Sequence, residues 1–212
     1  MSRFDNFSLE SWNCLSRSEQ QILLQHSKGG LLRLCQGDIA AAHTKSVGAV
    51  VNAANPPMYQ GGGGTNMALS NVIKDDVWNK AAEDSGTLAT GGVASCPWEL
   101  KEGVEAANAR YLIHALGPIV KDPKQFELAE GLVYRAYSGV FNLAQQLGLD
   151  SVQMPFLSTG IYAQALSPSA RVEWKRIVDN TIYQTILEAF DRDFREVILL
   201  DHGQVPWSAK CF

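Results

Sequence analysis

The sequence predicts an α/β protein in which helices cover both faces of a central mixed, largely parallel sheet, in a three-layer α/β/α arrangement. Three observations support this prediction. Short apolar segments alternate with longer amphipathic ones from residue 31 to residue 201, which is typical of strand–helix–strand units. The apolar run at residues 48–51 has no polar alternation, as in a parallel strand buried on both faces. Polar or glycine-rich segments directly follow three of the strands, at the sheet edge where α/β proteins bind ligands.

Apolar periodicity and turn residues place the individual elements. Strands are expected at residues 31–36, 48–51, 91–97, 110–116, 151–155 and 196–200. Helices are expected at residues 39–43, 66–73, 75–85 and 126–147, and a last helix begins at residues 167–168. In that last helix an apolar residue recurs every fourth position, which predicts a core-facing stripe made of Trp174, Val178, Ile182, Ile186 and Phe190.

Residues 1–30 are expected to form an N-terminal helical extension to a single domain at residues 31–212. Ser16 and Glu19 have the spacing of a helix capping box, and apolar residues follow at positions 22–24. The extension either packs on the domain or docks to a partner. Near the other end, Trp207 either covers the mouth of a ligand pocket or packs the C-terminus.

Composition excludes several functional classes. The 212 residues are 46% hydrophobic and 19% charged, with a net charge of −4, so a general nucleic-acid-binding surface is not expected. The four cysteines are scattered without metal-ligand spacing, namely Cys14, Cys35, Cys96 and Cys211, so neither a metal site nor a cofactor is expected. No run is long enough to span a membrane, and no signal peptide is evident. We therefore expect a monomer that is cytoplasmic, or exported without a cleavable signal peptide.

A glycine-rich loop is the most informative stretch. The strand at residues 48–51 is followed by the carboxamides Asn52 and Asn55, and then by a run of four glycines, namely Gly61, Gly62, Gly63 and Gly64. Glycine allows the backbone to approach a ligand closely, and the N-terminus of the next helix attracts anions. The loop has neither dinucleotide-binding spacing nor a Walker lysine. It is therefore either a flexible surface turn or a site for a diphosphate held by backbone amides, with the two carboxamides binding flanking sugars.

Two further loops follow strands. Asp38 comes after the strand at residues 31–36, and it is either the N-cap of the next helix or a partner for a purine amine. Ser158, Thr159, Gly160 and Ile161 follow the strand at residues 151–155, where their donors would form a second wall around a diphosphate. His114 lies in an apolar run and is expected to be a core residue.

Together these segments resemble the macrodomains, a family that binds ADP-ribose. The matching motifs, in the family's order, are GDI at 37–39, VNAAN at 51–55, four glycines at 61–64, IHALGP at 113–118 and PFLSTGIY at 155–162. The resemblance implies that Asp38 binds the adenine amine beside the Ile39 amide. It implies that Asn55 binds the distal ribose near Tyr162, and that the glycine amides and the loop at 158–161 hold the diphosphate.

The resemblance leaves two functions open. One is a hydrolase that removes mono-ADP-ribose from modified protein side chains or deacetylates O-acetyl-ADP-ribose, with Asn55 and Asn66 at the reacting end. The other is a non-catalytic reader that binds ADP-ribose or an ADP-ribosylated protein. Asn66 stands where macrodomain hydrolases of one subgroup have an aspartate, and an amide cannot accept a proton from water. Leu200 stands where relatives often place an aromatic residue against adenine.

Overall fold

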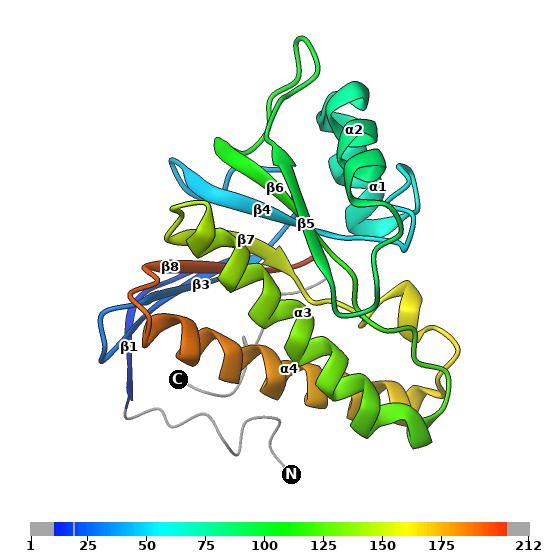
Figure 1. The fold of residues 1–212 in the computed structure, drawn as a ribbon. Coiled ribbons are helices and arrows are strands. Elements are labelled where there is room, and N and C mark those ends of the chain that lie inside the picture. The colour runs from blue at the N-terminus through cyan, green and yellow to red at the C-terminus, as the bar shows by residue number, and fades with distance from the viewer. Residues whose placement is uncertain (1–10, 19, 203–212) are drawn as a thin grey trace.

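The computed structural model of the protein describes residues 11–18 and 20–202, so the predictions for Trp207 and Cys211 fall outside the described residues. One eight-stranded sheet organises the chain, with the strand order β1-β2-β3-β8-β7-β4-β6-β5 (Figure 1). The strands are β1 (Trp12–Arg17), β2 (Gln21–His26), β3 (Leu31–Gln36), β4 (Val47–Ala53), β5 (Val93–Pro97), β6 (Ala109–Ala115), β7 (Ser151–Pro155) and β8 (Glu196–Asp201).

The predicted mixed, largely parallel sheet is confirmed. β3, β8, β7, β4 and β6 are consecutive neighbours and all parallel. The β1–β2 hairpin extends one edge and β5 the other, each antiparallel to its neighbour. Because the five parallel strands share one direction, the loops after them emerge at one edge of the sheet, as the sequence predicts.

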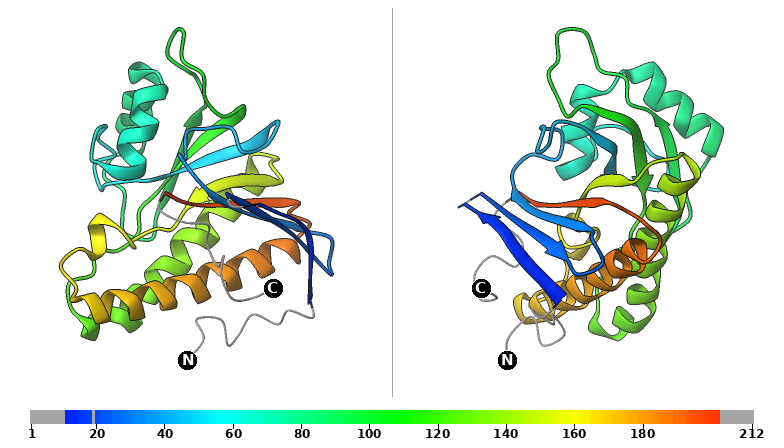
Figure 2. Two further views of the ribbon diagram at one scale, coloured as in Figure 1. Left: turned by 180° about the vertical axis from the view of Figure 1, so that it is seen from behind. Right: turned by 90° about the vertical axis from the view of Figure 1, so that its left-hand side faces the viewer.

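Helices cover both faces of the sheet, which gives the predicted three layers (Figures 1 and 2). α1 (Gly64–Val72) and α2 (Asp75–Ser85) lie on one face, where Leu69 and Trp78 pack against the sheet. α3 (Phe126–Gln146) and α4 (Pro168–Phe190) lie on the other face. The apolar stripe of α4 is buried along its whole length, as predicted. Two short 3-10 turns, Pro123–Gln125 and Ile161–Ala163, complete the regular elements of the described residues.

The helix expected near the N-terminus is wrong. The segment forms β1 and β2 instead, and the β2 side chains Ile22, Leu24 and His26 alternate with more exposed ones as one face of a strand does. Ser16, the predicted helix cap, lies inside β1, and the Ser18 hydroxyl accepts from the Gln21 N–H at 3.1 Å in the turn between the two strands. Pairing with β3 thus overrides the local helical signal.

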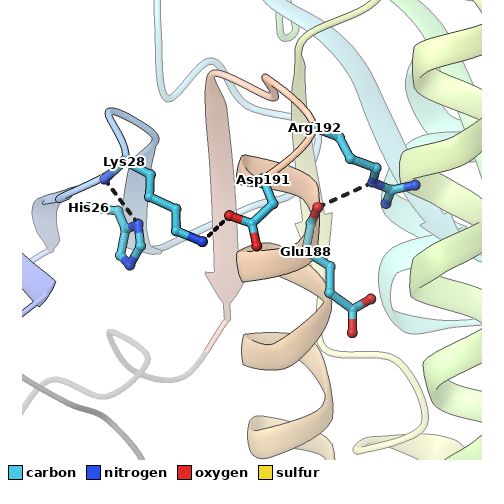
Figure 3. Close-up of polar contacts among 5 residues, drawn as sticks. All are labelled: His26, Lys28, Glu188, Asp191 and Arg192. Carbon is cyan, nitrogen blue, oxygen red and sulfur yellow. Dashed lines mark hydrogen bonds and ion pairs between the residues drawn. The ribbon is translucent and has the colours of Figure 1, made fainter.

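The hairpin packs against the C-terminal half of α4. The Trp12 indole donates to the Tyr183 hydroxyl at 3.1 Å and its ring meets the His26 imidazole edge-on at 4.8 Å. Figure 3 shows Lys28 forming an ion pair with Asp191 at the end of α4, while the Lys28 N–H donates to His26 Nδ1 at 3.3 Å. β1 and β2 therefore continue the body of the domain rather than forming a helical extension beside it.

Candidate functional site

Two adjoining cavities lie at the carboxyl edge of the parallel strands. The larger, of about 560 Å³, is lined by residues at or just beyond the ends of β3, β7 and β8, among them Asp38, Ile39 and Leu200. The smaller, of about 190 Å³, is lined by Asn55 and Asn66 among others. Both cavities share four lining residues, namely Gly64, Thr65, Phe156 and Gly160. The shared wall makes them one elongated site, with a broad end at Asp38 and a narrow end at Asn55.

The glycine loop separates the two ends. Gly61, Gly63 and Gly64 have φ values of 74°, 86° and 52°, a conformation that glycine adopts without strain. No side chain caps the start of α1. Within the described residues, no hydrogen bond uses the amides of Gly63, Gly64 or Thr65. These three N–H groups at a helix N-terminus can therefore bind an anion.

The first half of the glycine loop differs from the prediction. The Gly61 N–H donates to the Ser70 hydroxyl at 3.2 Å, and the Gly62 N–H donates to Asn66 Oδ1 at 2.9 Å. Both acceptors belong to α1, one turn apart. In this structure the Gly61 and Gly62 amides are therefore bonded to side chains of α1, whereas the predicted role of the loop falls on the amides that follow them. Gly61 also lies outside the lining of either cavity, whereas Gly62 lines the narrow one.

The loop after β7 forms the opposite wall and is held by helices of the other face. The Tyr137 hydroxyl accepts from the Leu157 N–H at 2.7 Å and donates to the Pro155 carbonyl at 3.1 Å. The Trp174 indole donates to the Ser158 carbonyl at 2.8 Å. Ser158 has a φ of 60°, which is rare for a residue with a side chain and is maintained only by such anchoring.

Ile161 joins the two walls. An added Cβ at Gly63 would lie 3.0 Å from Ile161 Cδ1, so the glycine permits the isoleucine to lie against the loop. Gly160 lines both cavities, Thr159 lines the broad one, and Ser158 and Ile161 line the narrow one. The structure thus brings the two predicted loops together around the narrowest part of the site.

Asn55 and Tyr162 mark the narrow end. The Asn55 side chain donates to the Tyr59 carbonyl and accepts from the Tyr59 N–H, both at 2.8 Å. One donor hydrogen and one acceptor lone pair of the amide remain for a ligand. The Tyr162 hydroxyl donates to the Ala54 carbonyl at 3.3 Å. Partial burial raises the pKa of Tyr162, so the phenol stays protonated at neutral pH.

Asn52, which the sequence places beside a ligand, lies in the core in this structure. Asn52 is fully buried, and its amide nitrogen donates to His114 Nδ1 at 3.1 Å, away from both cavities. His114 is the predicted core residue. Burial lowers the pKa of its imidazole to about 4, so it is neutral, with its proton on Nε2 and 3.8 Å between that nitrogen and Cys96 Sγ.

At the broad end, Asp38 begins a turn rather than the expected helix at residues 39–43. Its carboxylate accepts from the Ala40 N–H at 2.9 Å, and the side chain remains exposed at the cavity. The buried Gln153 side chain donates to the Ile39 and Ala41 carbonyls at 2.7 and 2.9 Å. Sequence reasoning missed this anchor, although a glutamine in the middle of the apolar strand β7 is an unusual residue that could have indicated it.

The described residues contain no cluster of histidine, cysteine and acidic side chains that could hold a metal ion. None of the helices in the described part of the chain has the length and apolar character needed to cross a bilayer. Among the described residues, two carboxylates line the broad cavity, Asp38 and Asp201, and only uncharged side chains line the narrow one. The Asp201 carboxylate forms an ion pair with Lys175 at 3.1 Å.

A family model described as Macro domain matches residues 51–173. The chain belongs to the macro domain family. It is 36% identical over 148 residues to a macro domain-containing protein of Vibrio parahaemolyticus, covering 66% of this chain and 78% of the relative. It is 28% identical over 192 residues to the ADP-ribose glycohydrolase of Archaeoglobus fulgidus, covering 84% of this chain and 96% of the relative. The Oceanobacillus iheyensis macrodomain solved with ADP matches with a TM-score of 0.60 at 25% identity, over 81% of this chain and 83% of that one.

Proposed function

We propose that this macro domain binds ADP-ribose across the two cavities and hydrolyses the bond between the distal ribose and the group attached to it. The observation that carries the proposal is the pair of unequal cavities on either side of free backbone amides. A purine fits the broad end, a diphosphate fits the amides, and a ribose fits the narrow end. The name of the Archaeoglobus relative, ADP-ribose glycohydrolase, supports the same ligand and reaction class.

The turn after β3 would bind the purine. The Asp38 carboxylate retains acceptor capacity beyond its bond to the Ala40 N–H and would accept from the purine amine. The Ile39 amide follows it in the same turn, and the Gln153 side chain stabilises this turn by donating to the Ile39 carbonyl. Leu200 lines this cavity as an apolar floor, in place of an aromatic ring.

Recognition of the diphosphate needs no basic side chain. Among the residues that the structure describes, no lysine, arginine or histidine lines the narrow cavity. Gly63, Gly64 and Thr65 line the narrow cavity together with Gly160 of the opposite loop. Preorganised backbone donors bind phosphate oxygens with little reorganisation, which is compatible with the net charge of −4.

The chemistry at the narrow end is constrained by the groups that line it. In residues 11–18 and 20–202, the lining of this cavity holds no carboxylate, histidine or cysteine, and its one titratable side chain is Tyr162, whose hydroxyl donates to the Ala54 carbonyl. The described lining therefore supplies no general base. We propose that a phosphate oxygen of the bound substrate orients the attacking water, while Asn55 fixes the ribose for in-line attack.

A non-catalytic reader is the second candidate. It is favoured by Asn66, whose oxygen is committed to the Gly62 N–H and which cannot take a proton from water. The same geometry would bind ADP-ribose on a partner protein without cleaving it.

One experiment separates the two candidates. The protein is incubated with a peptide mono-ADP-ribosylated on glutamate, and release of ADP-ribose is followed beside a calorimetric titration with free ADP-ribose. Hydrolysis is expected, and Asn55→Ala is expected to abolish it while weakening binding less. Binding without release assigns the protein as a reader. Absence of binding by the wild-type protein refutes both candidates.

A further inference from the structure

β5 forms one edge of the sheet, and its outer side opens into a groove of about 400 Å³ between the helices of the two layers (Figure 1). Ser85 of α2 lines one wall, and Gly139 and Leu143 of α3 line the other. Val93 and Ser95 of β5 lie between the two walls. Among the described residues, the groove shares no lining residue with the two cavities of the ligand site, so it is a separate feature of the surface.

The hydrogen bonds between β5 and β6 show which backbone groups of β5 point into this groove. The Trp98 N–H, just beyond β5, donates to the Arg110 carbonyl at 3.0 Å. In an antiparallel pair every second residue bonds to the neighbouring strand, so in the continuous register residues 94 and 96 also bond to β6. The N–H and C=O groups of Val93 and Ser95 point the opposite way. Within the part of the chain that the structure describes, β5 has no second neighbouring strand, so these two donors and two acceptors are unpaired.

The two edges of the sheet differ in how they are protected against pairing with a further strand. β1, at the other edge, has a register shift between Cys14 and Ser16, and such bulges commonly disrupt pairing at exposed edges. β5 pairs with β6 without a shift from Val93 to Pro97. Pro97 has no N–H, and it falls on the outward-facing register, where it ends the open stretch. The edge of β5 therefore offers a short, regular stretch of backbone.

We propose that the groove beside β5 binds an extended, uncharged segment of another protein, which adds to the sheet as a further strand. The Val93 and Ser95 N–H groups donate to two carbonyls of that segment, and their carbonyls accept from two of its N–H groups. Among the described residues that line the groove, none is charged. An added Cβ at Gly139 would lie 3.1 Å from Val93 Cγ1, so α3 passes close to the edge. The segment therefore carries small, uncharged side chains.

The flanking helices favour this occupant over a second copy of the chain. A second copy would bring its own α2 and α3 beside the same edge, so the helices of the two copies would meet across the groove as their β5 strands approached the pairing distance of about 4.8 Å. A single extended segment brings no helices with it. The described chain ends beside β1, at the opposite edge, and just after β8, which is four strands from β5. Neither end leads directly into the groove.

Binding is tested with the full-length protein labelled with ¹⁵N and a heptapeptide of alternating threonine and serine, blocked at both ends. At millimolar peptide, the amide proton signals of Val93 and Ser95 should move downfield and their hydrogen exchange should slow at least about tenfold, because each becomes hydrogen-bonded. The amides of residues 94 and 96 are the internal control, since they already bond to β6 and should change less. The same peptide with every amide N-methylated should leave all four signals unchanged.

Ser95→Pro is the matched variant of the protein. It removes one outward-facing donor and leaves the bonds of residues 94 and 96 to β6 in place. It should weaken peptide binding at least about tenfold, the scale of one lost hydrogen bond in a water-excluded groove. The affinity for ADP-ribose should be unchanged, because Ser95 lies outside both cavity linings. If this variant does not fold, the comparison with the N-methylated peptide decides alone.

Three results overturn the inference. The first is unmoved Val93 and Ser95 signals at millimolar peptide. The second is slow exchange of these two amides in the free monomer, which would show that a segment of the chain itself covers the edge. The third is slow exchange that appears only as the protein concentration rises and a dimer forms in light scattering, which would assign the edge to a second copy. Absence of ADP-ribose binding refutes the proposed function and leaves this inference standing, because the groove is separate from the ligand site.

Discussion

Tyr137→Phe tests whether a helix of one layer holds the wall of the site. The Tyr137 side chain is fully buried, and its hydroxyl satisfies both the Leu157 N–H and the Pro155 carbonyl. Phenylalanine leaves that N–H unpaired, at a cost of about 1–3 kcal/mol, and loses a second hydrogen bond worth about 1 kcal/mol. The free energy of unfolding should therefore fall by about 2–4 kcal/mol. For a domain of this size the melting temperature should fall by roughly 5–12 °C.

The same substitution should weaken ADP-ribose binding, because Leu157 precedes the strained Ser158 and both line the narrow cavity. Calorimetric melting and ADP-ribose titration measure the two effects. Tyr134→Phe is the matched control on the same helix, since its partly buried hydroxyl meets only the Glu188 carboxylate at 2.8 Å. It should cost less than about 1 kcal/mol. Equal stability of the two variants would refute the assignment of Tyr137 as the anchor of this wall.

Three further predictions concern the glycine loop, the buried histidine and the broad end. Gly63→Ala should weaken ADP-ribose binding at least tenfold in a calorimetric titration, because the added Cβ would press on Ile161. Gly103→Ala is the control, since Gly103 has a similar positive φ but no atom near its added Cβ; it should lower stability without affecting binding. Because the pKa of His114 in the folded protein is lowered to about 4, the unfolded chain takes up a proton at this residue at a higher pH than the folded protein does. The contribution of this group to stability is then full above about pH 6.5 and falls by on the order of 3 kcal/mol as pH drops toward 4. Urea unfolding at several pH values should show a shallower fall for His114→Gln than for the wild-type protein. Asp38→Ala should weaken ADP-ribose binding by about 1–3 kcal/mol, and an unchanged affinity would remove the carboxylate from the site.

The parts of the site predicted correctly from sequence are those set by backbone chemistry. The apolar run at residues 48–51, the four glycines and the start of α1 are local features, and the structure joins them as strand, loop and helix. The second loop was located for the same reason, because Pro155 ends an apolar strand and Gly160 follows. Such signals do not depend on what the rest of the chain does.

The sequence interpretation and the structure differ mainly in side-chain direction and in long-range strand pairing. β4 continues to Ala53, two residues beyond the expected end, so Asn52 lies inside the strand and opposite His114 in the register. In a strand, one residue more or less decides which face a side chain occupies. The β1–β2 hairpin is a second case, because its pairing with β3 is a long-range contact that a local capping pattern does not report.

The side chains that hold the two loops in place come from all three layers. Several of them could not be identified from the sequence for this reason. Ser70 and Asn66 of α1 hold the glycine loop from one face, Tyr137 and Trp174 of α3 and α4 hold the opposite loop from the other, and the sheet contributes Gln153. Each anchor is a helix or strand side chain bonded to loop backbone. The free amides between the loops are therefore preorganised, and a ligand need not spend binding energy to order them. It follows that substitutions at the anchors outside both cavity linings, namely Ser70, Tyr137, Trp174 and Gln153, should alter affinity without touching the ligand.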